Sequence, residues 1–166
     1  MRELTTSIDI DASPDAVWDV LTDFRRYPEW NPFMRVVGRA NEGAHLVVEL
    51  TPPGGRQFRF RPTVTRVDPN HELRWLGHLF VTGLYDGEHR FTLEATDEGT
   101  RTRFTQAESF GGVLAGLVNR FVGSATEAGF REMNAALKER VESGVKGEQS
   151  SAGVGDGNES GDEVAV

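Results

Sequence analysis

The chain has 166 residues, enough for one domain with its own core, and its lack of cysteine excludes disulfides and thiolate metal sites. The formal net charge of -8 argues against nonspecific binding of nucleic acid, because such binding needs a basic surface. No stretch is long and apolar enough to span a bilayer, and the N-terminus has no signal-peptide pattern, so we expect a cytoplasmic protein without an integral membrane segment.

The first part of the sequence predicts one strand followed by short helices. Polar and apolar residues alternate from Leu4 to Asp11, as in a half-buried strand. Ser13 and Pro14 fit the N-cap and the first position of a helix that continues to about Thr22. A second short helical turn is expected from Phe24 to Tyr27.

The next segment, Tyr27–Phe33, contains Pro28 and Pro32, which disfavour both a helix and a central strand. We therefore expect a stiff, irregular loop. Because binding residues are common on loops, its aromatic residues Trp30 and Phe33 are candidates for a lid over a cavity mouth.

Six further strands are predicted after this loop, separated by turns rich in glycine, proline, asparagine and aspartate. They are expected at Met34–Ala40, His45–Leu50, Arg56–Val67, His71–Phe80, Tyr85–Ala95 and Thr100–Ser109. Together with the first strand they would form a curved antiparallel sheet of seven strands.

A long amphipathic helix is predicted from Val113 to Ser143, with apolar residues at steps of three and four. A helix of about 30 residues is about 45 Å long, more than a small domain needs for packing alone, so its natural partner is the concave face of the sheet. Residues 144–166 have little to bury. We therefore predict one domain at 1–143 and a disordered acidic tail at 144–166.

Alternation in the last two strands directs four polar side chains toward the interior. Tyr85 and His89 lie on the apolar face of one strand, and Gln106 and Glu108 lie on the apolar face of the next. Buried polar groups need partners, and the floor of a ligand pocket is one place where they find them. The alternative is that these groups bond one another or meet water at the open end of the sheet.

The same interior supplies the candidates for lining a ligand cavity, although most of them fit an ordinary core equally well. They are Trp30, Phe33, Phe60, Trp75, Phe80, Tyr85, His89, Phe91, Phe104, Gln106, Leu117, Phe121 and Phe130. Small residues on the long helix, such as Gly116 and Gly123, favour either unfilled space or close contact between helix and sheet.

Sequence motifs for catalysis are few. There is no Gly-x-Ser-x-Gly elbow, phosphate-binding loop or His-Glu-x-x-His pair, and the four histidines are spread along the chain, so we expect no metal and no cofactor. The simplest catalytic design is a single inward acid or base. His89 or Glu108 would take a proton from a bound carbonyl compound, and Tyr85 would orient it.

The order of one strand, two short helices, six strands and a long helix, with the segments Ile8–Trp18 and Tyr27–Phe33, resembles the SRPBCC superfamily. This superfamily includes START-like lipid-transfer domains, the birch pollen allergen and polyketide cyclase/dehydrase-like proteins. His89–Leu93 and Gly99–Phe104 resemble its last hairpin, and the resemblance covers about residues 3 to 142. It implies an α+β helix-grip fold in which a seven-stranded curved antiparallel sheet wraps around the long C-terminal helix.

The resemblance also implies a hydrophobic ligand held between the sheet and the long helix. Our first expectation is binding or transport of a small hydrophobic or amphipathic molecule, such as a lipid. A polyketide cyclase/dehydratase-like enzyme that uses one inward acid or base is the second, and a protein-partner module with a filled core is the third. We expect a monomer or weak dimer.

Overall fold

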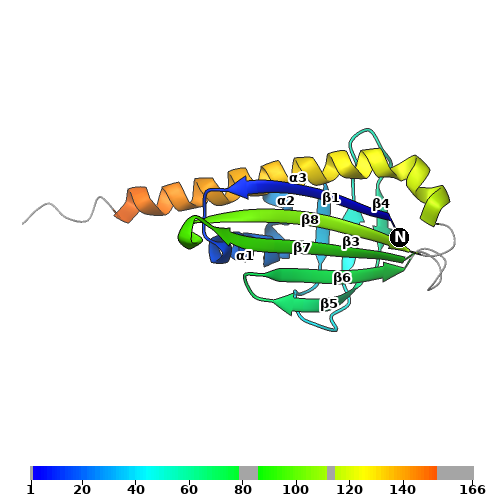
Figure 1. Ribbon diagram of the computed structural model, residues 1–166, viewed down its shortest axis with the longest axis horizontal. Helices are drawn as coiled ribbons and strands as arrows, with labels where there is room; N and C mark the ends of the chain where they lie inside the picture. Colours follow the sequence, from blue (N-terminus) through cyan, green and yellow to red (C-terminus); the bar gives the residue numbers. More distant parts are fainter. Residues whose placement is uncertain (1, 79–85, 112–114, 153–166) are drawn as a thin grey trace, which may run out of the picture.

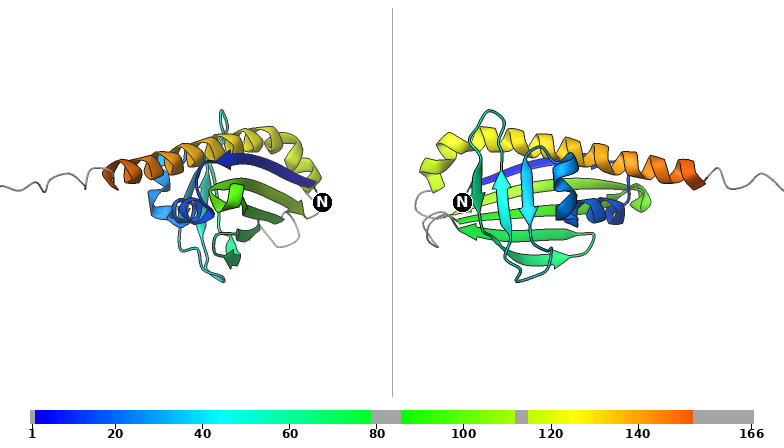
Figure 2. Two further views of the ribbon diagram at one scale, coloured as in Figure 1. Left: turned by 60° about the vertical axis from the view of Figure 1, so that its left-hand side comes forward. Right: turned by 180° about the vertical axis from the view of Figure 1, so that it is seen from behind.

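The computed structural model describes residues 2–78, 86–111 and 115–152, with residue 2, 115–123 and 148–152 by backbone alone (Figure 1). Its eight described strands form two antiparallel sheets. The first sheet has the order β1 (Arg2–Ile10), β8 (Arg101–Gly111), β7 (Asp86–Thr96), β6 (Glu72–His78) and β5 (Thr63–Asp68). The second has the order β2 (Met34–Val37), β3 (Val47–Leu50) and β4 (Phe58–Phe60). Figure 2 shows the second sheet, in cyan, standing across the strands of the first.

The α+β helix-grip fold is confirmed, but the prediction of seven strands in one sheet is wrong. The difference lies in the segment Arg56–Val67, which the sequence predicts as one strand. Pro62 has no backbone N–H and interrupts the ladder there. The chain on one side of it, β4, pairs with β3, whereas β5 on the other side pairs with β6. The chain therefore passes from the second sheet to the first at this proline.

The short helices pack at one end of the sheets (Figure 2). Helix α1 (Pro14–Thr22) begins at Pro14 as predicted, and a 3-10 turn, η1 (Phe24–Arg26), follows it. The prediction of an irregular loop is wrong for Tyr27–Trp30, which forms the single helical turn α2. Pro28 lies in the first turn of α2, where a missing N–H is harmless because that group has no partner within the helix.

The long helix α3 (Ala115–Ala152) lies along β1 and extends past the end of the sheet (Figure 1). Its buried residues Phe130, Met133, Leu137 and Val141 follow the predicted steps of three and four. The described helix continues beyond the predicted end at Ser143, so residues 144–152 are helical. The division into a domain and a disordered tail stays a prediction, and residues 153–166 lie outside the described part.

Glu142 links α3 to the segment between β1 and α1 through a hydrogen bond. Its Oε1 atom accepts a hydrogen bond of 2.9 Å from the backbone N–H of Asp11 and one of 2.5 Å from Lys138 Nζ. The hydrogen bond from Lys138 holds the pKa of the Glu142 carboxyl below its ordinary value of 4.5. The folded state therefore favours the charged carboxylate. This contribution to stability is present above pH 4.5 and is lost as the pH falls through the lowered pKa.

We expect Glu142→Gln to lower the free energy of unfolding at pH 7 by about 1 kcal/mol, because hydrogen bonds to a charged group are replaced by weaker ones. At pH 3 the difference between the variant and the unchanged protein should be smaller than at pH 7, because the carboxyl takes up a proton as the pH falls through its lowered pKa. Urea unfolding at the two pH values measures this. Glu139→Gln, at an exposed position of the same helix, is the control and should change stability little at either pH. A stability deficit of Glu142→Gln that is as large at pH 3 as at pH 7 would contradict the prediction.

Candidate functional site

The inward side chains of the first sheet form rows across its strands. In one row Trp75 of β6 lies opposite His89 of β7, and His89 lies opposite Glu108 of β8. In the adjacent row Phe91 of β7 lies opposite Gln106 of β8. His89 is 3% exposed and Gln106 is fully buried, so the predicted inward faces of these two strands are confirmed.

Both ring nitrogens of His89 have polar partners. Nδ1 makes a short hydrogen bond with Glu108 Oε2, and Nε2 lies 3.1 Å from the side-chain nitrogen of Gln106. An amide NH₂ group donates only, so Nε2 of His89 accepts and the ring proton is on Nδ1, which donates to the carboxylate. The two partners thus fix the tautomer and the orientation of the imidazole.

Aromatic rings enclose this histidine. The indole of Trp75 is stacked on it with centroids 5.1 Å apart and an interplanar angle of 16°. The rings of Phe91 and of Phe130, from α3, meet it edge-on at 4.5 and 5.2 Å. Within such an apolar enclosure the hydrogen bonds to Glu108 and Gln106 are electrostatically stronger than they would be in water.

Two glycines on neighbouring strands make room beside this row. Gly77 of β6 lies opposite Gly87 of β7. A Cβ atom on Gly87 would lie 2.7 Å from Glu108 Oε1, so the Glu108 carboxylate rests directly over the β7 backbone. A Cβ atom on Gly77 would lie 3.0 Å from the ring of Phe60, which reaches over from the second sheet. From the sequence, Gly77 was expected to mark a possible bulge, but the β6–β7 pairing is regular through Gly77 and Gly87. No role was predicted for Gly87.

Several buried polar atoms of the interior have no hydrogen-bond partner among the described residues. Gln106 Oε1 and Trp75 Nε1 are such atoms on the first sheet, and Thr126 Oγ1 and Asn134 Oδ1 are such atoms on α3. Leaving a buried polar group unpaired costs about 1–3 kcal/mol, so native interiors seldom hold several of them without a reason. Unpaired acceptors and a donor between the sheet and α3 match the needs of a ligand that carries hydroxyl or carbonyl groups.

The other predicted site residues fall into three groups. Phe33 and Phe104 are buried, and the ring of Phe33 packs against α3 at Gly129 instead of covering an opening. Trp30 and Phe60 are half-buried at the edge of the core. The predicted residues Phe80 and Tyr85 lie outside the described residues, as do the side chains of Leu117 and Phe121 on α3. Of the three predicted catalytic groups, the structure thus brings His89 and Glu108 together, and the role of Tyr85 stays a prediction.

Within residues 2–78, 86–111 and 115–152, no three His, Asp or Glu side chains gather as a set of metal ligands. Among the described helices, none combines the length and the apolar character needed to cross a membrane.

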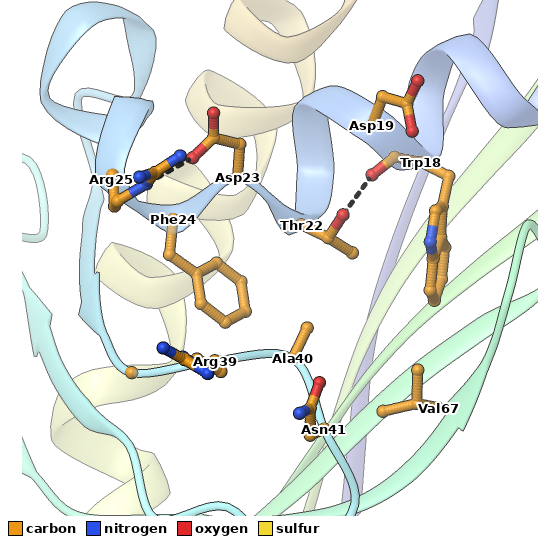
Figure 3. A pocket seen from close by; sticks show the side chains of 11 residues that line it. Trp18, Asp19, Thr22, Asp23, Phe24, Arg25, Arg39, Ala40, Asn41 and Val67 are labelled. Atoms are coloured by element: carbon orange, nitrogen blue, oxygen red, sulfur yellow. Dashed lines mark hydrogen bonds and ion pairs between the residues drawn. The ribbon is translucent and has the colours of Figure 1, made fainter.

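A cavity of about 550 Å³ lies outside this interior and was not predicted from the sequence (Figure 3). It lies between α1, the loop that follows β2, and β5, so its walls come from separate segments of the chain. No local pattern in any one segment indicates it.

The curved antiparallel sheets and the long helix that lies along them define a helix-grip domain. A family model described as polyketide cyclase / dehydrase and lipid transport matches residues 1–142, and the chain belongs to this family. The resemblance to the SRPBCC superfamily is thereby confirmed. The search of curated proteins gave no match.

Solved structures with the same fold include the Zhui aromatase/cyclase from Streptomyces sp. R1128, at 15% identity and a TM-score of 0.68 over 87% of this chain and 95% of that one. A norcoclaurine synthase point mutant from Thalictrum flavum, in complex with a transition state analogue, is 14% identical with a TM-score of 0.66 over 87% and 96%. Protein Ms6760 from Mycobacterium smegmatis is 20% identical with a TM-score of 0.61 over 80% and 88%. At these identities the similarity shows the fold alone.

Proposed function

We propose that this protein binds a small apolar or amphipathic molecule between the first sheet and α3. The observation that carries the proposal is the cluster of polar groups, His89, Glu108 and Gln106, which is held within an aromatic interior and faces the helix. The rings of Trp75 and Phe130 supply apolar contact area, and the unpaired Gln106 Oε1 and Trp75 Nε1 supply hydrogen-bonding capacity. A few polar groups within an apolar enclosure are typical of sites for small molecules.

The buried side chains that the structure describes on α3 run from Thr126 to Val141. The backbone of residues 115–125 continues along the sheet toward the β8 end at Gly111. We place the ligand over the cluster of polar groups at this end of the domain. The predicted lining residues Phe80, Tyr85, Leu117 and Phe121 belong to this proposal. The cytoplasmic location and the monomeric or weakly dimeric state also stay predictions.

A second candidate function, a cyclase- or dehydratase-like reaction, is favoured by the hydrogen bond between His89 and Glu108. Because Glu108 holds the ring proton on Nδ1, the lone pair of Nε2 is available as a base once Gln106 turns away. Nε2 would take a proton from the carbon next to a carbonyl group of the substrate. The resulting enolate would attack a second carbonyl carbon and form a carbon–carbon bond, and the new alkoxide would take the proton back from the imidazolium. The named aromatase/cyclase and norcoclaurine synthase structures are consistent with such chemistry on this fold.

Binding can be tested without knowing the natural ligand. Native mass spectrometry of freshly purified protein should show a reproducible adduct, and titration with emodin or oleic acid should show saturable binding of one molecule per chain. Arg59→Gln, on the outer face of the second sheet with its side chain 65% exposed, is the control and should bind equally well. The absence of an adduct, together with no saturable binding of either probe up to about 100 μM, would contradict the proposal.

A further inference from the structure

The cavity of about 550 Å³ beside α1 is a separate compartment from the interior described above. Its size falls within the range of about 300–1,000 Å³ that small-molecule sites occupy. Phe24, which is 3% exposed, lines the cavity, and its ring meets the fully buried Trp75 edge-on at 6.3 Å. The ring of Phe24 thus separates this cavity from the row that contains His89.

Two aromatic rings form facing parts of the cavity wall. Figure 3 shows the indole of Trp18 on one side and the ring of Phe24 on the other, with Val67 and Ala40 at the base. Rigid rings offer a large contact area at low cost in conformational entropy and favour a flat aromatic guest between or beside them. Thr22, between the two rings, directs its hydroxyl to the carbonyl oxygen of Trp18 at 2.8 Å, so its methyl group is left as wall.

A cationic side chain of the cavity lies on the wall opposite α1. Arg39 and Asn41 flank Ala40 in the loop after β2, and within the described part of the chain neither side chain forms a hydrogen bond or an ion pair. Two acids, Asp19 and Asp23, line the cavity on the α1 side. Asp23 Oδ1 accepts from Arg25 Nε at 3.4 Å, and the carboxylate of Asp19 points away from the cavity (Figure 3).

From this arrangement we propose that the cavity binds a planar aromatic molecule that carries a carboxylate. The ring lies against Trp18 and Phe24, and the carboxylate meets the guanidinium of Arg39 and the side-chain amide of Asn41. A guanidinium binds a carboxylate with two parallel hydrogen bonds, and an amide NH₂ adds a further donor. An aromatic ammonium compound finds no free acceptor of opposite charge on that wall.

The test uses the full-length protein and two probes of similar shape and opposite charge, 2-naphthoate and 2-naphthylmethylammonium. In ¹⁵N-edited NMR titrations, 2-naphthoate should shift the indole N–H of Trp18 and the backbone amides of Thr22 and Asn41. Its affinity should exceed that of the ammonium probe. Arg39→Gln should weaken 2-naphthoate binding about three- to fivefold, as expected for loss of an ion pair at an exposed site. The control Arg59→Gln should leave it unchanged.

A second variant tests whether 2-naphthoate binds in this cavity. Ala40→Leu adds a larger side chain at the base of the cavity and should abolish these shifts while leaving the binding of emodin and oleic acid intact. Failure of this proposal is therefore distinguishable from failure of the proposed function. Equal affinity for the two naphthyl probes, shifts confined to residues around His89, an unchanged affinity in Arg39→Gln, or no saturable shift up to about 10 mM would each overturn it.

Discussion

Replacing Gly129 with alanine is expected to lower the free energy of unfolding by about 1–3 kcal/mol, the usual cost of overfilling a packed core. A Cβ atom at this position would lie 2.2 Å from both Cδ2 and Cε2 of the Phe33 ring. Phe33 is 1% exposed and its ring packs edge-on against Phe130 at 5.7 Å. Because the ring is confined, either it or the helix must move.

The helix propensity of alanine works in the opposite direction, since alanine is about 1 kcal/mol better than glycine within a helix. Gly144→Ala measures the effect of helix propensity alone, because Gly144 lies on the same helix and a Cβ atom there meets no atom within 4 Å. We expect Gly144→Ala to raise stability slightly, and urea unfolding of both variants measures the difference. In the background of Phe33→Leu, which leaves a smaller side chain over the helix, Gly129→Ala should cost much less. If Gly129→Ala raised stability as Gly144→Ala does, the close contact between Phe33 and α3 would be refuted.

This contact also illustrates what could be read from the sequence. The prediction that Phe33 lies near a cavity mouth rested on two prolines in its own segment, whereas its position is set by Gly129, far away in the chain. A glycine within a helix is compatible either with empty space or with close approach of another group. Only the fold shows that at Gly129 the space is filled.

The two proline predictions failed for related reasons. Pro28 was expected to exclude a helix, but a proline in the first helical turn removes an N–H that has no partner there. Pro62 was included within one predicted strand, although a proline cannot donate to a central ladder. In both cases the position of the proline within an element decides its effect, and alternation alone does not reveal where an element begins.

The inward faces of β7 and β8, by contrast, could be predicted, because side chains on a strand alternate regularly between its two faces. Phe91 and Phe104 mark the buried face, and the parity then places His89, Gln106 and Glu108 on it. The register between the two strands could not be predicted in the same way. That His89 lies directly opposite Glu108 depends on the hairpin at Asp97–Gly99, so the sequence indicated a shared face but not the contact.

Among substitutions around His89, removal of the Glu108 carboxylate is expected to lower the free energy of unfolding most. Glu108→Ala leaves the Nδ1–H of His89 buried without an acceptor, which costs about 1–3 kcal/mol of stability. Glu108→Gln keeps an oxygen in the same place and should cost under about 1 kcal/mol, because the tautomer with the proton on Nδ1 can still donate to it. Urea unfolding should therefore rank the two variants clearly, and a larger loss for Glu108→Gln would contradict the assigned tautomer.

A glycine substitution tests the position of the carboxylate without removing it. Gly87→Ala places a methyl group 2.7 Å from Glu108 Oε1, and the end of a flexible side chain can move away at little cost in stability. The Nδ1–H resonance of His89 should then shift upfield as its hydrogen bond lengthens, and Gly111→Ala is the control because its Cβ meets no atom within 4 Å.

Measurements of turnover and of ligand affinity distinguish a catalytic role of His89 and Glu108 from a binding role. If His89 acts as a base, Glu108→Gln and Gly87→Ala should both lose turnover of a diketone substrate while still binding emodin. The first variant removes and the second displaces the carboxylate charge that stabilises the imidazolium formed on proton transfer, and this charge matters less for apolar contact. If the site only binds, emodin affinity in both variants should stay within about threefold of the unchanged protein, and no variant should alter a reaction rate. Turnover that survives in Glu108→Gln would remove Glu108 from the catalytic role and leave the pair as the polar floor of a binding site.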